Sequence, residues 1–204
     1  MAVAGSKDPR TARTRGRLRE ALLAACEEQP LEQVAVADVV RRAGVGRATF
    51  YLHYDDLHTL AVDACAGLVR DAVDALHAWE TPPGPERPPG ALVDLLDAVR
   101  ARAAVHRSLL RPGGGGPLGE LLHEELMRRS LAERRQRRPG GGDADEAVAS
   151  AVAALFTGVL ADWVHGRVAG TPPELAARVW RMLVALQASH GRVPPHEASH
   201  RQNG

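Results

Sequence analysis

The sequence is poor in aromatic residues and in cysteine, and each shortage argues against a class of protein. Only 3% of its 204 residues are Phe, Trp or Tyr, whereas Ala, Leu, Val and Arg dominate. Since β-branched and aromatic runs are typical of strands, this composition predicts an all-α fold. The two cysteines, Cys26 and Cys65, lie on apolar helical stripes, where a free thiol usually behaves as a small buried hydrophobe. A redox pair is the weaker alternative.

Segments typical of membrane and secreted proteins are also missing. We find no apolar stretch long enough to span a bilayer and no charged and apolar leader at the start. We therefore expect a cytoplasmic protein without a membrane partner.

Charge is unevenly placed along the chain. The net charge is only +1, so the protein as a whole is not a basic coat for nucleic acid. Residues 1–19, however, contain six basic residues against Asp8 alone, a balance of +5. Because residues 1–13 also lack apolar periodicity, they are expected to form a flexible basic arm.

Apolar periodicity predicts four helices in the N-terminal part. The first helix ends near residue 30 and buries Leu18, Leu22 and Cys26. Two short helices follow, over 36–43 and over 46–53. Asp55 can cap a fourth, longer helix that runs to about residue 79.

Gly- and Pro-rich breaks at 81–90, 111–119 and 139–143 divide the C-terminal part. After the last break we expect two long helices, over 143–168 and 171–190. Their apolar faces are predicted to comprise Val148, Val152, Leu155, Val159 and Trp163, and then Val179, Met182, Leu183 and Leu186.

The segment TPPE predicts the start of the last helix by a capping box. Thr171 is the expected N-cap, Pro172 the first helical residue and Glu174 the side chain that bonds back. Residues 191–204 are mostly polar and are predicted to be a flexible tail.

Residues 38–54, DVVRRAGVGRATFYLHY, have the pattern of a helix-turn-helix. A helix is followed by a glycine-containing turn at Gly44 and then by a second short helix. The apolar residues predicted to form a miniature core between the helices are Val39, Val40, Val45 and Phe50. The residues expected to project outward are Arg47, Ala48, Thr49, Tyr51 and His53.

At AGVGRATFYLHY the chain resembles the TetR family of bacterial transcription regulators. The resemblance implies that Arg47 and Ala48 face the bases and that Thr49, Tyr51 and His53 contact phosphates. Gly46 stands where the family usually has serine, and it joins the candidate DNA-binding residues.

Two further positions depart from the family pattern: Leu57 replaces a lysine that grips phosphate, and Ala35 replaces a threonine. We therefore expect Arg10 and Arg13 of the basic arm to supply phosphate affinity.

The resemblance also implies how the chain is organised: a helix-turn-helix domain over 14–70 and a helical domain for effector binding and dimerisation over 71–190. The implied protein is a homodimer that packs residues 143–190 as a four-helix bundle, binds a palindromic operator and is released by a small molecule. No cofactor, metal site or catalytic residue is expected. Residues of the effector pocket are predicted to include His106, His123 and Trp163, although an ordinary surface or core role is the alternative for each histidine.

Other patterns in the sequence are weaker indications of function. His196, Glu197 and His200 spell a zinc-protease motif but lie in the polar tail, and the glycines at 114, 116 and 119 lack the strand that dinucleotide binding needs. The arginines within 128–138 are expected to be a solvated helix end, with a protein-partner surface as the alternative. A helical enzyme that uses the C-terminal cavity is the remaining rival function.

Overall fold

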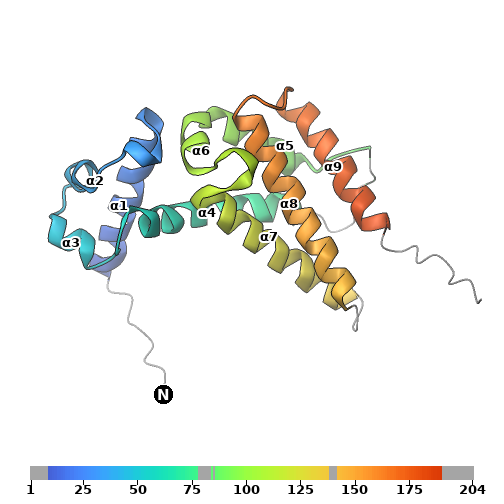
Figure 1. The fold of residues 1–204 in the computed structure, drawn as a ribbon, viewed down its shortest axis with the longest axis horizontal. Coiled ribbons are helices and arrows are strands. Elements are labelled where there is room, and N and C mark those ends of the chain that lie inside the picture. Colours follow the sequence, from blue (N-terminus) through green and yellow to red (C-terminus); the bar gives the residue numbers. More distant parts are fainter. Residues whose placement is uncertain (1–8, 78–83, 85, 138–141, 190–204) are drawn as a thin grey trace, which may run out of the picture.

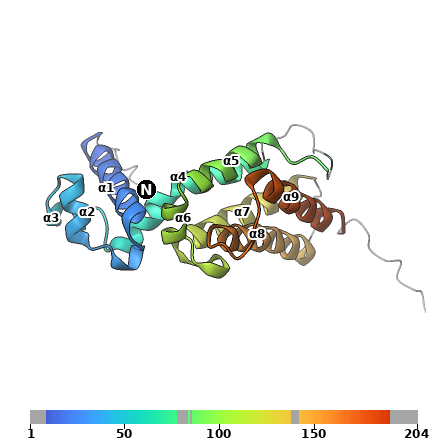
Figure 2. The same cartoon turned by 90° about the horizontal axis from the view of Figure 1, so that it is seen from above.

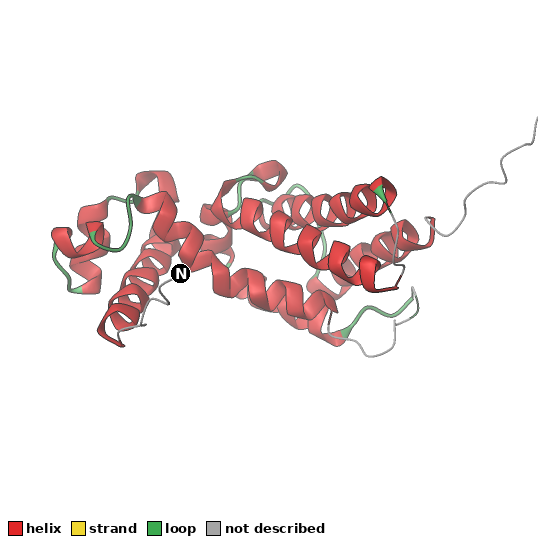
Figure 3. Ribbon diagram, turned by 90° about the horizontal axis from the view of Figure 1, so that it is seen from below, coloured by secondary structure: helices red, strands yellow, loops and turns green. Residues whose placement is uncertain are grey.

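A computed structural model of the chain describes residues 9–77, 84, 86–137 and 142–189. In this part of the chain all regular structure is helical, as predicted (Figure 3). The elements are α1 Pro9–Glu28, η1 Leu31–Gln33, α2 Val36–Ala43, α3 Arg47–Tyr51, α4 Leu57–His77, α5 Gly90–Ala101, α6 Ala103–Leu109, η2 Pro112–Gly114, α7 Gly116–Arg137, α8 Asp143–Val164 and α9 Pro172–Ser189.

Helices α1–α3 form an N-terminal head at one end of an elongated molecule (Figures 1 and 2). Leu22 of α1, Val39 of α2 and Phe50 of α3 have no appreciable exposed area, so the three helices share one small core. The long helix α4 begins against this head and leads into the remaining helices, so it links the two parts of the molecule.

Helices α4–α9 form the C-terminal bundle. Helix α7 packs between α4 and α8, while α9 packs against α5 and α8 (Figure 1). Leu122, Phe156 and Leu175 are buried where these helices meet. The indole Nε1 of Trp180 donates to the carbonyl of Gly84 at 3.0 Å, which fixes α9 to the segment before α5.

Two glycines have specific structural roles. Gly44 ends α2 with φ 60°, a left-handed conformation that favours glycine, and its carbonyl accepts a hydrogen bond from Arg17 Nη2 at 3.2 Å. Gly119 lies within α7, although residues 111–119 were predicted to be a break between helices. A Cβ there would lie 1.9 Å from the carbonyl oxygen of Gly114, so only glycine permits this approach.

The structure corrects the predicted limits of three helices. Helix α1 begins at Pro9, so Arg10 and Arg13 are helical and not part of a flexible arm. The cap of α4 is Asp56 and not Asp55, because Asp56 Oδ1 accepts the Thr59 N–H at 2.7 Å. Helix α8 ends at Val164, four residues early, because the chain turns at Gly166 with φ 75°.

The start of α9 follows the prediction. Pro172 is its first residue, and the Thr171 N–H donates to Glu174 Oε2 at 2.8 Å. The remaining parts of the predicted arm and tail, with the zinc-protease pattern at 196–200, lie outside the described residues.

Helix α8 overturns one expectation drawn from composition. By length and composition alone, Asp143–Val164 is apolar enough to cross a membrane, although no such stretch was expected in the chain. In the structure Ala149, Ala153 and Phe156 of this helix are buried inside the bundle, as in the core helix of a globular protein.

Candidate DNA interface

The helix-turn-helix predicted over 38–54 is present as α2, a short turn and α3. The Val45 N–H donates to the Val40 carbonyl at 3.0 Å across the turn. Val39, Val40 and Phe50 are buried and Val45 is half-buried, which confirms the predicted miniature core. Their packing fixes the orientation of α3 on α2.

The outer face of α3 presents the predicted DNA-contact residues to solvent. Arg47, Ala48 and Tyr51 are exposed, Tyr51 to 48%, whereas Thr49 and His53 are half-buried. Gly46 is exposed and precedes the helix as its N-cap residue.

One apolar residue of this surface was missed. Leu52, directly after α3, exposes 82% of its area. Sequence periodicity could not predict this, because α3 is too short to define a face.

Arg47 and Tyr51 lie one helical turn apart and contact each other. The guanidinium carbon of Arg47 is 5.8 Å from the centroid of the Tyr51 ring, within the range of a cation–π contact. Arg47 Nη2 also donates a long hydrogen bond of 3.5 Å to the Tyr51 hydroxyl. The Tyr51 ring therefore supports the Arg47 guanidinium on the exposed face of α3.

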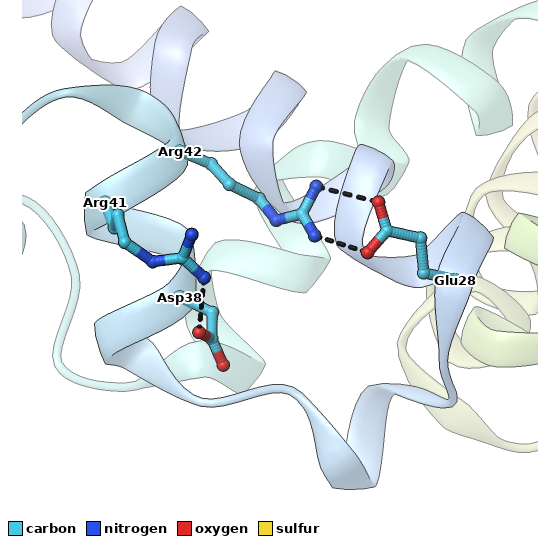
Figure 4. Close-up of polar contacts among 4 residues, drawn as sticks. All are labelled: Glu28, Asp38, Arg41 and Arg42. Atoms are coloured by element: carbon cyan, nitrogen blue, oxygen red, sulfur yellow. Dashed lines mark hydrogen bonds and ion pairs between the residues drawn. The ribbon is translucent and has the colours of Figure 1, made fainter.

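Two further arginines of α2 are engaged within the head (Figure 4). Arg42 bonds Glu28 of α1 through both guanidinium amino groups, one of them at 2.9 Å, and its hydrogen bonding lowers the pKa of the Glu28 carboxyl. Arg41 pairs with Asp38 of the same helix at 2.8 Å. The Arg42 pair connects α2 to α1. Both arginine charges are paired with carboxylates that belong to the head itself.

A polar cluster joins the head to α4. Asp63 of α4 forms ion pairs with Arg15 at 3.3 Å and Arg19 at 3.5 Å, and accepts a hydrogen bond from the Tyr54 hydroxyl. Arg15 Nε also donates to the Tyr54 hydroxyl at 3.2 Å. Burial, followed by the bond to Asp63, raises the pKa of Tyr54. The cluster thus connects α1, the end of the helix-turn-helix and α4.

Two ion pairs join the head to the bundle. Glu27 of α1 pairs with Arg102, between α5 and α6, at 3.1 Å, and Glu32 of η1 pairs with Arg111 at the same distance. A cleft of about 650 Å³ lies between the end of α1 and α6 beside these pairs. The contacts of the head are therefore concentrated on α4 and on the α5–α6 region.

Comparison with known proteins finds matches among solved structures only. No protein-family model matches the chain, and no curated protein matches it. A TetR transcriptional regulator from Streptococcus agalactiae matches with a TM-score of 0.57 at 21% identity, over 87% of this chain and 97% of that one. The chain has the TetR fold.

Two further regulators support this assignment. A TetR regulator from a Rhodococcus species matches with a TM-score of 0.59 at 18% identity, over 89% of this chain and 98% of that one. A TetR-family regulator from Streptomyces coelicolor has a TM-score of 0.57 at 18% identity, over 88% of this chain and 82% of that one. The helix-turn-helix and the helical C-terminal bundle are therefore features of the fold that these chains share.

The bundle of this TetR fold contains a cavity of about 340 Å³. Three polar residues, Asp71, Arg102 and His106, contribute to its wall. The larger apolar side chains of the wall are Leu68, Leu95, Val99, Leu118, Leu122 and Leu160. Arg102 is notable because the same residue pairs with Glu27 of the head.

The structure does not bring the three predicted pocket residues together. His106 lines the cavity, whereas His123 lies half-buried on α7 outside its wall. Trp163 lines a separate hollow of about 360 Å³ and donates through Nε1 to the Gly170 carbonyl at 2.9 Å. The resemblance indicated that the middle helices surround a cavity, but it could not tell which side chains of these helices line it.

Proposed function

We propose that the protein is a transcription regulator of the TetR type. It binds a palindromic operator as a homodimer, acts as a repressor in the cytoplasm, and is released by a small-molecule effector. The observation that carries the proposal is an exposed α3, with Arg47, Ala48 and Tyr51 outward, on a TetR fold. Arg47 and Ala48 contact base edges, while Thr49, Tyr51 and His53 contact phosphates.

The basic residues of α1 extend the proposed phosphate surface. Arg10 and Arg13 are exposed in the first turns of this helix, on the head that carries α3. As helical side chains they hold a fixed position relative to α3, which a flexible arm would not give them. They compensate for the absence of the lysine that the family pattern has at the position of Leu57.

The dimer interface is proposed to use α8 and α9. Four residues of the predicted apolar face of α8, Val148, Val152, Leu155 and Val159, are only half-buried, whereas Ala149, Ala153 and Phe156 are fully buried. Val152, Leu155 and Val159 pack in part against the core and leave the rest of their surface open.

Met182, on the predicted apolar face of α9, is 39% exposed. A second copy that covers both faces would complete a four-helix bundle, and its two-fold axis would relate the two heads.

Effector control is proposed to act through the helices around the cavity. Since Arg102 belongs both to the cavity wall and to the Glu27 pair, a ligand that shifts Arg102 also changes a contact of the head. Such a ligand releases DNA only if it binds more tightly to the conformation that cannot span the operator.

Control by a protein partner through the arginines of α7 is less well supported. Arg128, Arg129 and Arg135 pair with Glu125, Glu133 and Glu146 of the same chain. These pairs favour a solvated helix end.

Enrichment of genomic DNA tests the proposal. Purified protein is mixed with sheared genomic DNA of the source organism, and the retained fragments are sequenced with and without a heparin competitor. We expect a few short segments that each contain an inverted repeat. Uniform retention of all fragments would show that the protein is not a sequence-specific regulator.

A further inference from the structure

The cavity in the bundle has one buried polar side chain in an otherwise apolar interior. His106 is 5% exposed and lines the cavity among leucine and valine side chains. The other two polar residues of the wall, Asp71 and Arg102, are exposed and therefore lie where the cavity meets solvent. The chemistry of His106 therefore limits which polar group a ligand can bring into the interior.

The hydrogen bonding of His106 fixes the role of each ring nitrogen. Nδ1 lies 2.9 Å from the carbonyl oxygen of Arg102, and a carbonyl only accepts, so Nδ1 carries the proton. In a neutral ring Nε2 is then an acceptor. Among the residues that the structure describes, none donates to Nε2. A ligand in the cavity can supply that donor.

Two effects favour the neutral form of the His106 ring near pH 7. Burial lowers the pKa of His106, and the neighbouring positive charge of Arg102 lowers it further. The hydrogen bond to the Arg102 carbonyl raises this pKa, but the net shift is downward. Arg102 is itself paired with Glu27, so its charge is already partly offset. Asp71 adds a negative charge to the wall. Neither the ring acceptor nor Asp71 favours an anion.

We propose that the cavity takes an uncharged apolar molecule with a hydroxyl group, which donates a hydrogen bond to Nε2 of His106. The apolar part packs against Leu95, Val99, Leu122 and Leu160. A carboxylate of the same length is rejected, because it would present a second acceptor and a desolvated charge to Nε2. This inference names the ligand class of the sensor site and thus rests on the proposed effector function.

The test compares 1-octanol with octanoate, which share a chain and differ in the polar group. Binding to the full-length protein without DNA is measured by isothermal titration calorimetry at pH 7.5. We expect octanol to bind roughly tenfold more tightly than octanoate or better. Equal affinity, tighter binding of octanoate, or no binding of octanol would overturn the proposal.

Two variants at His106 form a matched pair. In His106→Asn the amide nitrogen can replace Nδ1 toward Arg102, but no acceptor remains at the position of Nε2. In His106→Gln the amide oxygen can reach that position. We expect octanol to bind about fivefold more weakly to the Asn variant and nearly normally to the Gln variant. Equal losses in both, with circular dichroism unchanged, would assign His106 a packing role and contradict the proposal.

Operator binding separates this inference from the proposed function. If octanol binds as expected but leaves protein–DNA complexes intact, the effector function fails while the ligand class stands. If octanol fails to bind and the protein still selects a palindrome, the ligand class fails while the regulator stands.

Discussion

Among single residues, Arg47 matters most for the proposed recognition of DNA sequence. Its guanidinium rests on the Tyr51 ring at the exposed start of α3, where an arginine can bond O6 and N7 of guanine together. Arg41 is also exposed in the same motif but pairs with Asp38. Two arginines close in sequence thus have different expected roles.

Replacement of Arg47 tests this assignment. We expect Arg47→Ala to weaken operator binding by about 1–3 kcal/mol per half-site and to relax the preference at one symmetric position. His53→Ala should weaken binding to all sequences alike, because a phosphate contact carries no sequence information. Arg41→Ala is the matched control and should keep the wild-type preference. Binding selections on the three variants decide the matter, and an unchanged preference for Arg47→Ala would assign this residue to the backbone.

The cysteines provide a second prediction at this scale. Burial, with a smaller contribution from Cys26, raises the pKa of Cys65 to about 12. At pH 8 only about one molecule in ten thousand then carries the Cys65 thiolate, the form that reacts. Native protein should resist alkylation of Cys65 by iodoacetamide, while protein unfolded in urea should react fully. The alkylation of Cys65 is measured by mass spectrometry in both samples. Equal labelling would contradict a buried, protonated thiol.

At the scale of elements, local sequence rules predicted the parts that local chemistry determines. Gly44 ends α2 and Glu174 caps α9 as expected, because each effect involves residues within one or two turns. The predictions that failed depended on distant neighbours. The inner face of α8 is set by α7 and α9, and small residues such as Ala149 and Ala153, which periodicity ranks below valine, allow the close packing.

The candidate site shows the same division. The outward residues of α3 were predicted, because the motif is contiguous. Partners far apart in the chain, such as Asp63 with Arg15 or Glu27 with Arg102, left no pattern that a single sequence could reveal.

The Asp63 cluster yields a prediction for the contact between α1 and α4. Asp63→Asn keeps an acceptor for the Tyr54 hydroxyl but removes the charge that pairs with Arg15 and Arg19. Because both arginines are partly exposed, we expect the free energy of unfolding to fall by only about 1 kcal/mol in urea titrations. Asp97→Asn, which breaks an exposed pair within α5, should cost less than about 0.5 kcal/mol. A larger loss at Asp97 would contradict the importance of the cluster.

For the molecule as a whole, the proposed operator binding requires two copies of the chain. The half-buried faces of α8 and α9 are the expected contact, and the head of the chain lies at the opposite end of the molecule from α9 (Figure 1). A single head offers one short helix to DNA, so tight binding needs a second head held in fixed spacing.

A charge placed on α8 tests the interface. We expect Leu155→Arg to shift the protein from dimer to monomer in sedimentation velocity experiments and to reduce operator affinity by more than about a hundredfold. Ala154→Arg changes an exposed residue of the same helix and should leave both unchanged. A folded Leu155→Arg protein that stays dimeric would place the interface elsewhere.

In the proposed function, the protein recognises a defined DNA sequence through two symmetric heads. The most direct measurement is selection of binding sites by the purified wild-type protein from a pool of random double-stranded DNA, followed by sequencing. We expect an inverted repeat whose half-sites are about one helical turn or somewhat more apart, with a guanine in each half-site. A selected pool with no enriched palindrome would contradict it.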